Sequence, residues 1–285
     1  MPGDIEFFNH HEYSWTSADG LKLFAQSWLP QGNPRAIINY VHGFKDHSNR
    51  FSHWAIKLTQ EGFGVIAIDL RGHGRSEGRR GYADSFERYL QDTEVLCSFS
   101  LRNYPSIPLI LYGHSLGGNI VTNYLISGKD LPDAAVITSP WFKLAFQPSL
   151  MARTMAIILR YTLPGILVRS DLDTMGLSRD PKIGENYLKD PLVHNRISPK
   201  LFIAIEKNGA KASRSIYKIN IPLLVMHGTA DIITSFRQTK AFVLHAGHRT
   251  RFKEWPGCQH ELHNELCADE IFSFLVCWLN KQVSG

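Results

Sequence analysis

Ser115 stands among small residues at the end of an apolar run, in the segment "LILYGHSLGGNI" (109–120). Gly113 and Gly117 flank it at two residues' distance, and glycines let a strand and a helix pass closely without Cβ clashes. The backbone N–H groups that follow would lie at a helix N-terminus, where negative charge is favoured. The pattern Gly113-His114-Ser115-Leu116-Gly117 is that of a nucleophile elbow. We therefore predict that Ser115 is a nucleophile.

Two later segments carry side chains that could activate this serine. A serine nucleophile needs a general base, and the base needs an orienting carboxylate. Asp231 follows the apolar run 221–228, and His260 follows the last β-rich run, 250–257. The chain order serine, aspartate, histidine is the order of the α/β-hydrolases. We predict that Ser115, Asp231 and His260 form a catalytic triad.

Other residues compete for two of these roles. His263 is the main rival to His260, and a surface or capping role at the start of a helix is its alternative. Glu254, within the last predicted strand, and Asp69, at the end of an earlier one, compete with Asp231. We favour His260 and Asp231, and we expect the other histidines near these segments to be structural or exposed; these are His227, His245 and His248.

An oxyanion hole needs two backbone N–H groups aimed at the developing negative charge. One is the N–H of Leu116, directly after the nucleophile. We predict that the other is the N–H of Phe44, in the loop after the run 36–43, where Gly43 lets the backbone turn. His42 either braces this loop by hydrogen bonding or only packs there.

The elements that must position these residues follow from the alternation of short apolar runs with helical spacing. Continuous apolar strands alternating with helices predict an α/β fold with a mostly parallel central sheet flanked by helices. In such sheets the chemistry collects at the carboxyl ends of the strands. Strands are predicted at 36–43, 64–70, 108–115, 134–140, 221–228 and 250–257, an antiparallel strand at 21–29, and helices at 50–62, 84–103, 116–128, 236–246 and 261–281.

The β–α alternation breaks between residues 141 and 221, and we expect this segment to insert over the strand ends as a helical cap. Residues 1–140 and 222–285 would then form the core. The cap segment contains 13 Lys and Arg residues and 6 Asp and Glu residues, a net charge of +7, whereas the whole chain carries +5. The excess of positive charge is therefore in the cap.

The composition excludes several classes of protein. With 285 residues, 44% of them hydrophobic, the chain can form one large domain with a core. A dispersed net charge of +5 does not predict nucleic-acid binding. Four cysteines without C-x-x-C spacing indicate free thiols and no metal site. We find no secretory signal and no transmembrane segment, and expect a cytoplasmic protein.

Several segments together resemble the monoacylglycerol lipase and lysophospholipase branch of the serine α/β-hydrolases, over residues 12–279. The more specific ones are "LRGHGRSEG" (70–78) and "HELHNE" (260–265), beside "GHSLGG" and "HGTADIITS". The resemblance implies an α/β-hydrolase fold with a mobile apolar cap, no cofactor, and the triad and oxyanion hole named above. It implies hydrolysis of fatty-acyl esters, chiefly of monoacylglycerol to glycerol and fatty acid through an acyl-enzyme.

The cap also offers candidate lipid contacts. Met151, Met155 and Ile158 recur at helical spacing and are candidate substrate-binding residues, while Arg153 and Arg160 share a different face. An amphipathic basic helix can lie peripherally on an anionic membrane and admit an acyl chain below it. The alternative is an ordinary cap helix packed on the core with solvated arginines.

Other functions stay open from the sequence. A lysophospholipase or a general carboxylesterase would use the same triad. An S33-type aminopeptidase would need acidic cap residues, and Glu185, Asp190 and Glu206 form no evident cluster. A non-catalytic binding protein with this fold would not need an intact triad. Cys258, two residues before His260, is either a loop residue without a role or a thiol whose modification would block the site.

Overall fold

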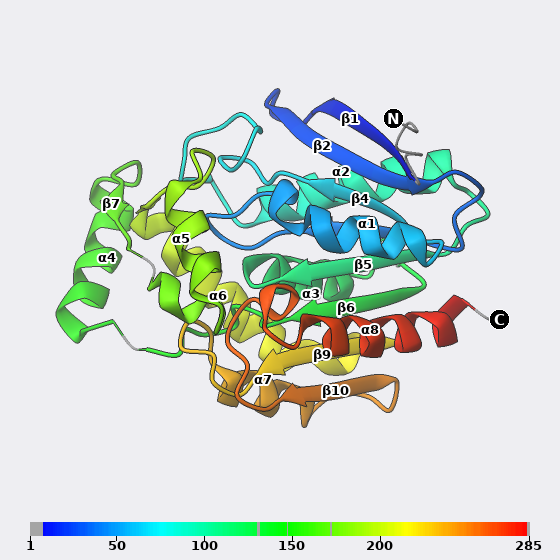
Figure 1. The fold of residues 1–285 in the computed structure, drawn as a ribbon. Coiled ribbons are helices and arrows are strands. Elements are labelled where there is room, and N and C mark those ends of the chain that lie inside the picture. Colours follow the sequence, from blue (N-terminus) through cyan, green and yellow to red (C-terminus); the bar gives the residue numbers. More distant parts are fainter. Residues whose placement is uncertain (1–7, 130–131, 147, 172, 284–285) are drawn as a thin grey trace.

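The computed structural model describes residues 8–129, 132–146, 148–171 and 173–283 (Figure 1). Within these ranges, eight strands form one sheet in the order β1-β2-β4-β3-β5-β6-β9-β10. The pairs β1–β2 and β2–β4 are antiparallel and the other pairs are parallel. The strands are β1 Phe8–Thr16, β2 Lys22–Pro30, β3 Ile37–Val41, β4 Gly64–Ile68, β5 Leu109–His114, β6 Ala134–Thr138, β9 Leu223–Gly228 and β10 Thr250–Trp255.

This architecture confirms the predicted α/β fold, its mostly parallel sheet and its antiparallel strand at β2. Strand β1 was not predicted. Its sequence FNHHEYSWT is polar and mostly exposed, so it lacks the apolar run that identifies a buried strand. It pairs only with β2, at the edge of the sheet, where one face need not be covered.

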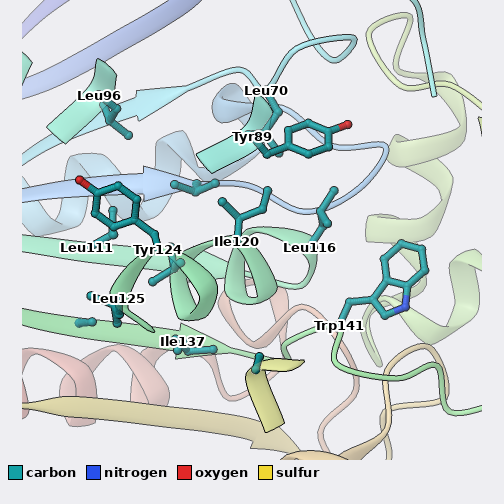
Figure 2. Close-up of a cluster of buried hydrophobic side chains, with 14 of the residues drawn as sticks. Leu70, Tyr89, Leu96, Leu111, Leu116, Ile120, Tyr124, Leu125, Ile137 and Trp141 are labelled. Atoms are coloured by element: carbon teal, nitrogen blue, oxygen red, sulfur yellow. The ribbon is translucent and has the colours of Figure 1, made fainter. Parts of the chain in front are cut away.

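Alternate side chains of each central strand enter two separate cores, because successive side chains of a strand point to opposite faces. Leu109 and Leu111 of β5 pack in one core, and Ile110 and Tyr112 pack in the other. The first core is closed by α2 (Glu87–Asn103) and α3 (Leu116–Ser127), the second by α1 (Ser52–Gln60) and α8 (Ala268–Val283). Figure 2 shows the first core, with Leu116, Ile120 and Tyr124 of α3 near Leu111 of the sheet.

The helices differ from their predicted bounds mainly at their first turns. The predicted helix 50–62 is a 3-10 turn at Ser48–Phe51 followed by α1, and the predicted helix 261–281 is a separate 3-10 turn at Leu262–Asn264 followed by α8. Helix α7 covers Phe236–Val243. Among the described residues, no helix is both long enough and apolar enough to span a membrane.

Between β6 and β9 the chain leaves the sheet and forms the segment expected to be a cap. It contains α4 (Leu150–Thr162), the short strands β7 (Val168–Arg169) and β8 (Arg196–Ile197), α5 (Pro181–Lys189) and α6 (Pro199–Ser215). Helix α6 is tied to α3, since the amide nitrogen of Asn119 donates to the carbonyl of Ile205 over 3.1 Å. Helix α4 stands at the far end of the molecule (Figure 1) and has no buried residue.

Candidate active site

Ser115 lies in a strained turn between β5 and α3. Its φ of 54° is in the left-handed region, which a non-glycine residue adopts at a cost. The turn is possible only because its neighbours lack side chains: a Cβ at Gly113 would overlap the Gly117 carbonyl, and one at Gly117 would overlap the carbonyl oxygen of Val41. This is the geometry of a nucleophile elbow, and it places Ser115 in the wall of a cavity at the carboxyl ends of the strands.

Asp231 and His260 come together at the same edge of the sheet. Asp231 follows β9 and His260 follows β10, and the two strands are parallel neighbours. The Oδ2 atom of Asp231 lies 2.7 Å from Nδ1 of His260. Its Oδ1 atom accepts hydrogen bonds from the backbone N–H groups of Ile233 (2.8 Å) and Thr234 (2.9 Å). The imidazole of His260 is thereby held by a carboxylate that is itself fixed, and it lines the cavity with Ser115.

The electrostatics suit a carboxylate that stays ionised beside a basic imidazole. Burial alone would raise the pKa of Asp231, but the charge of His260 and hydrogen bonds from His227 and His260 outweigh it and hold this pKa below its ordinary value. Burial alone would lower the pKa of His260, but the charge and hydrogen bond of Asp231 raise it above its ordinary value. His260 is thus a stronger base than a free imidazole.

The rivals for these roles lie in other environments. Burial lowers the pKa of His263 to about 4, and its Nε2 is buried without a hydrogen-bond partner in the described part of the chain. Asp69 is occupied by the backbone N–H groups of Ser48 and Arg75. Glu254 pairs with Lys240 across 2.9 Å on the outer strand β10. The expectation of a surface or capping role for His263 is wrong, because its 3-10 turn points the ring inward against Phe51.

The loop after β3 lies directly over the nucleophile. A Cβ at Gly43 would come within 3.1 Å of the Ser115 Cβ, so this loop can approach only through a glycine. The Nε2 of His42 accepts the Leu70 N–H (2.9 Å), which leaves Nδ1 to donate to the Gly43 carbonyl (2.7 Å). His42 therefore braces the loop by hydrogen bonding. The Phe44 residue that follows lines the cavity, and Leu116 supplies an N–H at the first position of α3.

Three residues to which the sequence analysis gave no role at the site support Asp231 and His260. Ser139, whose φ is 43°, donates its hydroxyl to the His260 carbonyl over 2.7 Å. The Thr234 hydroxyl lies 2.8 Å from Oδ2 of Asp231. His227 is fully buried, with Nε2 3.0 Å from the same Oδ2 and Nδ1 3.0 Å from the Thr239 hydroxyl. His227 was expected to be structural or exposed, and its apolar surroundings in the sequence gave no signal of this contact.

An ion-pair bridge joins the loop carrying His260 to the loop carrying Phe44. Arg50 donates to both carboxylate oxygens of Glu261 (2.7 and 2.8 Å) and to Asp46 (3.0 Å). Burial would raise the pKa of Glu261, but the charge of Arg50 lowers it. All three side chains are nearly inaccessible to solvent. The bridge therefore fixes the base relative to the predicted oxyanion loop.

The cavity around Ser115 has a volume of about 330 Å³ and is lined by both apolar and charged side chains. Its apolar lining includes Trp141, Leu144, Leu177, Ile232 and Ile233. Its charged lining consists of Lys45 and Arg50 with the carboxylates of Asp46, Asp171, Asp173 and Glu261. The candidate substrate contacts Met151, Met155 and Ile158 do not line this cavity: they are at least half exposed on α4. Glu185, Asp190 and Glu206 do not line it either.

Neither metal nor thiol chemistry has an evident place at this site. Within the described residues, no group of three or more His, Cys, Asp or Glu side chains could hold a metal ion. None of the four cysteines, all of which lie in the described part of the chain, forms a disulfide. Cys258 is buried with its sulfur 3.2 Å from that of Cys267, and burial raises the pKa of its thiol to about 12, so it is a weak nucleophile at neutral pH.

Comparison with known proteins identifies the family and the fold. The family model of serine aminopeptidase S33 matches residues 32–267. A monoacylglycerol lipase of Mycolicibacterium smegmatis is 30% identical over 274 residues, which cover 94% of this chain and 98% of that protein. The crystal structure of Paleococcus ferrophilus monoacylglycerol lipase superposes with a TM-score of 0.81 at 28% identity, covering 96% of this chain and 99% of the other.

A further relative is longer. An uncharacterized abhydrolase domain-containing protein of Dictyostelium discoideum is 29% identical over 273 residues, 94% of this chain, and the chain spans only 29% of its length. The family match and the lipase relatives nevertheless cover nearly the whole chain. The chain therefore belongs to the serine aminopeptidase S33 family of α/β-hydrolases, in its monoacylglycerol lipase branch, and is a carboxylic ester hydrolase.

Proposed function

We propose that the chain hydrolyses monoacylglycerol through an acyl-enzyme on Ser115. His260 takes the serine proton as Ser115 attacks the ester carbonyl, while Asp231 orients the imidazole and stabilises its positive charge. The N–H groups of Phe44 and Leu116 stabilise the oxyanion. Glycerol leaves with the proton from His260, and water then hydrolyses the acyl-enzyme by the same route. The observation that carries this proposal is the 2.7 Å contact of Asp231 with His260 beside the Ser115 elbow.

The lining of the cavity supports a neutral glycerol head group. Its apolar side chains suit an acyl chain, and its polar side chains offer acceptors and donors for hydroxyl groups. The lining has four carboxylates against two cationic side chains, so a phosphate group would meet a net negative environment. We infer that monoacylglycerol is preferred over lysophospholipid. The same carboxylates favour a second candidate, release of an N-terminal residue whose amine is positively charged, which accords with the family description.

The test compares three substrates at one pH: a long-chain monoacylglycerol, the matching lysophosphatidylglycerol, and an alanine anilide. We expect rapid fatty-acid release from the first only, and loss of this release in Ser115→Ala. Faster release from the lysophospholipid would overturn the head-group preference, and cleavage of the anilide alone would favour the peptidase. A fluorophosphonate probe should label Ser115 covalently; failure to label would indicate a non-catalytic protein.

We also propose that the cap contacts anionic membranes peripherally. At 100° per residue, Met151, Met155 and Ile158 share one face of α4, and each is at least half exposed. Arg153 and Arg160 lie on the opposite face of the same helix and contribute positive charge to this part of the molecule. Binding to anionic vesicles should exceed binding to neutral ones and weaken in the variant Arg153→Glu with Arg160→Glu. Equal binding to both vesicles, or no change in the variant, would rule the proposal out.

A further inference from the structure

A second cavity lies between the cap and the core, on the other side of Trp141 from the catalytic pocket. Its volume is about 610 Å³, compared with about 330 Å³ for the catalytic pocket, and among the described residues none lines both. Its walls come from α4, α6, α7 and the segment 142–143. Cavities of 300–1,000 Å³ are typical of sites for small organic ligands. Its size alone therefore permits a ligand distinct from the one in the catalytic pocket.

The floor of this cavity is apolar. Phe142 and Phe242 are buried there with ring centroids 4.4 Å apart, and Phe202 lies beside them. Ala156 and Ile157 of α4 form the opposite wall, and Ile157 is 52% exposed. These two residues lie on the face of α4 opposite to Met151 and Met155. The inner face of α4 thus presents apolar surface to a space that the protein does not fill, and a ligand with an apolar body would bury it.

The rim of the cavity is cationic. It carries Lys143, Arg153, Lys207 and Arg214, against one carboxylate, that of Glu206. Among the described residues, Lys143, Lys207 and Arg214 form no ion pair within 4 Å. The Glu206 carboxylate accepts the Trp141 indole N–H over 2.9 Å and interacts with the charges of Arg153 and Lys143, but one carboxylate cannot neutralise four cations. The rim therefore has an excess of positive charge that an anionic group would neutralise.

We propose that this cavity binds a long-chain fatty-acid anion, with its carboxylate among the rim cations and its chain on the aromatic floor. The choice of ligand rests on the proposed function in one respect: a fatty acid is the product that acyl-ester hydrolysis releases. Trp141 connects the two sites, since it lines the catalytic pocket while its indole contacts Glu206 in the wall of the second cavity. Fatty acid held there would be separated from the catalytic pocket by the Trp141 side chain.

The test is calorimetric titration with dodecanoate below its micelle concentration, using protein whose Ser115 has been blocked by a fluorophosphonate. Blocking keeps dodecanoate out of the catalytic pocket. If no labelling occurs, unlabelled protein is titrated, and the double variants described below assign the bound dodecanoate to the second cavity. Labelling thus reports on the proposed function, and titration reports on the second site. We expect saturable binding of about one dodecanoate and at least tenfold weaker binding of neutral dodecanol, a difference of about 1.4 kcal/mol.

Two matched double variants locate the site. Lys207→Glu with Arg214→Glu should weaken dodecanoate binding at least tenfold. Lys211→Glu with Lys218→Glu changes the net charge equally at exposed cap positions outside the cavity, and should leave binding within twofold. The proposal is overturned if dodecanoate shows no saturable binding, if dodecanol binds equally well, or if both double variants lose affinity for dodecanoate equally. It is also overturned if the protein binds anionic vesicles but not dodecanoate.

Discussion

At the carboxyl ends of the strands, the Asp231 carboxylate contacts five polar atoms of four residues. Helix α4, by contrast, has no buried residue among its 13. The first region is organised by directional hydrogen bonds and strained backbone. The second presents apolar and cationic side chains to open space. A proton transfer needs donors and acceptors fixed within tenths of an ångström, while recognition of acyl chains needs only apolar area and tolerates movement.

The largest expected effect is at the acid. Asp231→Asn removes the charge that raises the pKa of His260 and favours the wrong imidazole tautomer, and should lower kcat by about 10⁴-fold. Steady-state hydrolysis of the preferred ester measures it. Glu254→Gln, at the half-buried rival position, should retain activity within twofold. If Glu254→Gln lowered kcat as much as Asp231→Asn, Asp231 would not be distinguished from Glu254 as the carboxylate that orients His260.

The next effect is on stability. Arg50→Met leaves the buried carboxylates of Asp46 and Glu261 unpaired and should reduce the free energy of unfolding by about 3–5 kcal/mol. Lys57→Met, which removes the exposed pair of Lys57 with Asp269, should cost less than about 1 kcal/mol. Urea unfolding at neutral pH measures both. If both variants lost the same free energy of unfolding, the buried Arg50 bridge would stabilise the protein no more than the exposed Lys57 ion pair.

The stability difference caused by Arg50→Met should also depend on pH. Burial would raise the pKa of Glu261, but Arg50 lowers it, so the stabilisation is present above the unfolded-state pKa of about 4.3 and is lost as pH falls through the folded-state value. The difference between the wild type and the variant should therefore shrink below about pH 4. A difference that grows on acidification would contradict the assigned direction.

A smaller effect is expected at His227, which positions Asp231. His227→Leu removes a donor to the Asp231 carboxylate, so the charge acts more strongly on His260 and raises its pKa. The acid limb of kcat/KM should move to higher pH, because the base must be neutral, with activity about tenfold lower at neutral pH. Glutamine can still donate a hydrogen bond to Asp231, so His227→Gln should keep the pH profile of the wild type. An unchanged limb in His227→Leu would mean that His227 only fills space.

The smallest stability effect should be on α4. Met155→Ser with Ile158→Ser should change the free energy of unfolding by less than about 0.5 kcal/mol, because both side chains are at least half exposed. The same variant should weaken binding to anionic vesicles severalfold. Leu244→Ser, an exposed apolar position on the other side of the second cavity, is the control. Substantial destabilisation by the α4 variant would show that this helix packs more firmly than its exposure indicates.

The sequence was informative where a residue's chemistry and its place at a strand end coincide. Ser115, Asp231 and His260 follow β5, β9 and β10, and the structure brings the last two into contact. His227 and Ser139 were missed because their roles depend on contacts with residues that only the folded sheet brings near. Met151 and Met155 recur at helical spacing, as expected for helix α4. Spacing does not say whether the face they share is turned to the protein or to solvent, and in the structure this face is exposed.

The segment predicted to be a cap leaves the sheet after β6 and returns to the protein body at α6, and this has a consequence for engineering. Helix α6 is the crossover that joins the neighbouring parallel strands β6 and β9. Residues 139–198 thus form one enlarged strand-to-helix loop. Such a loop can be exchanged for that of another hydrolase without altering the strand register. Chimaeras joined at Trp141 and Ser198 retain Ser139, which donates to the His260 carbonyl, and should keep the nucleophile elbow while taking their substrate range from the donor of the loop.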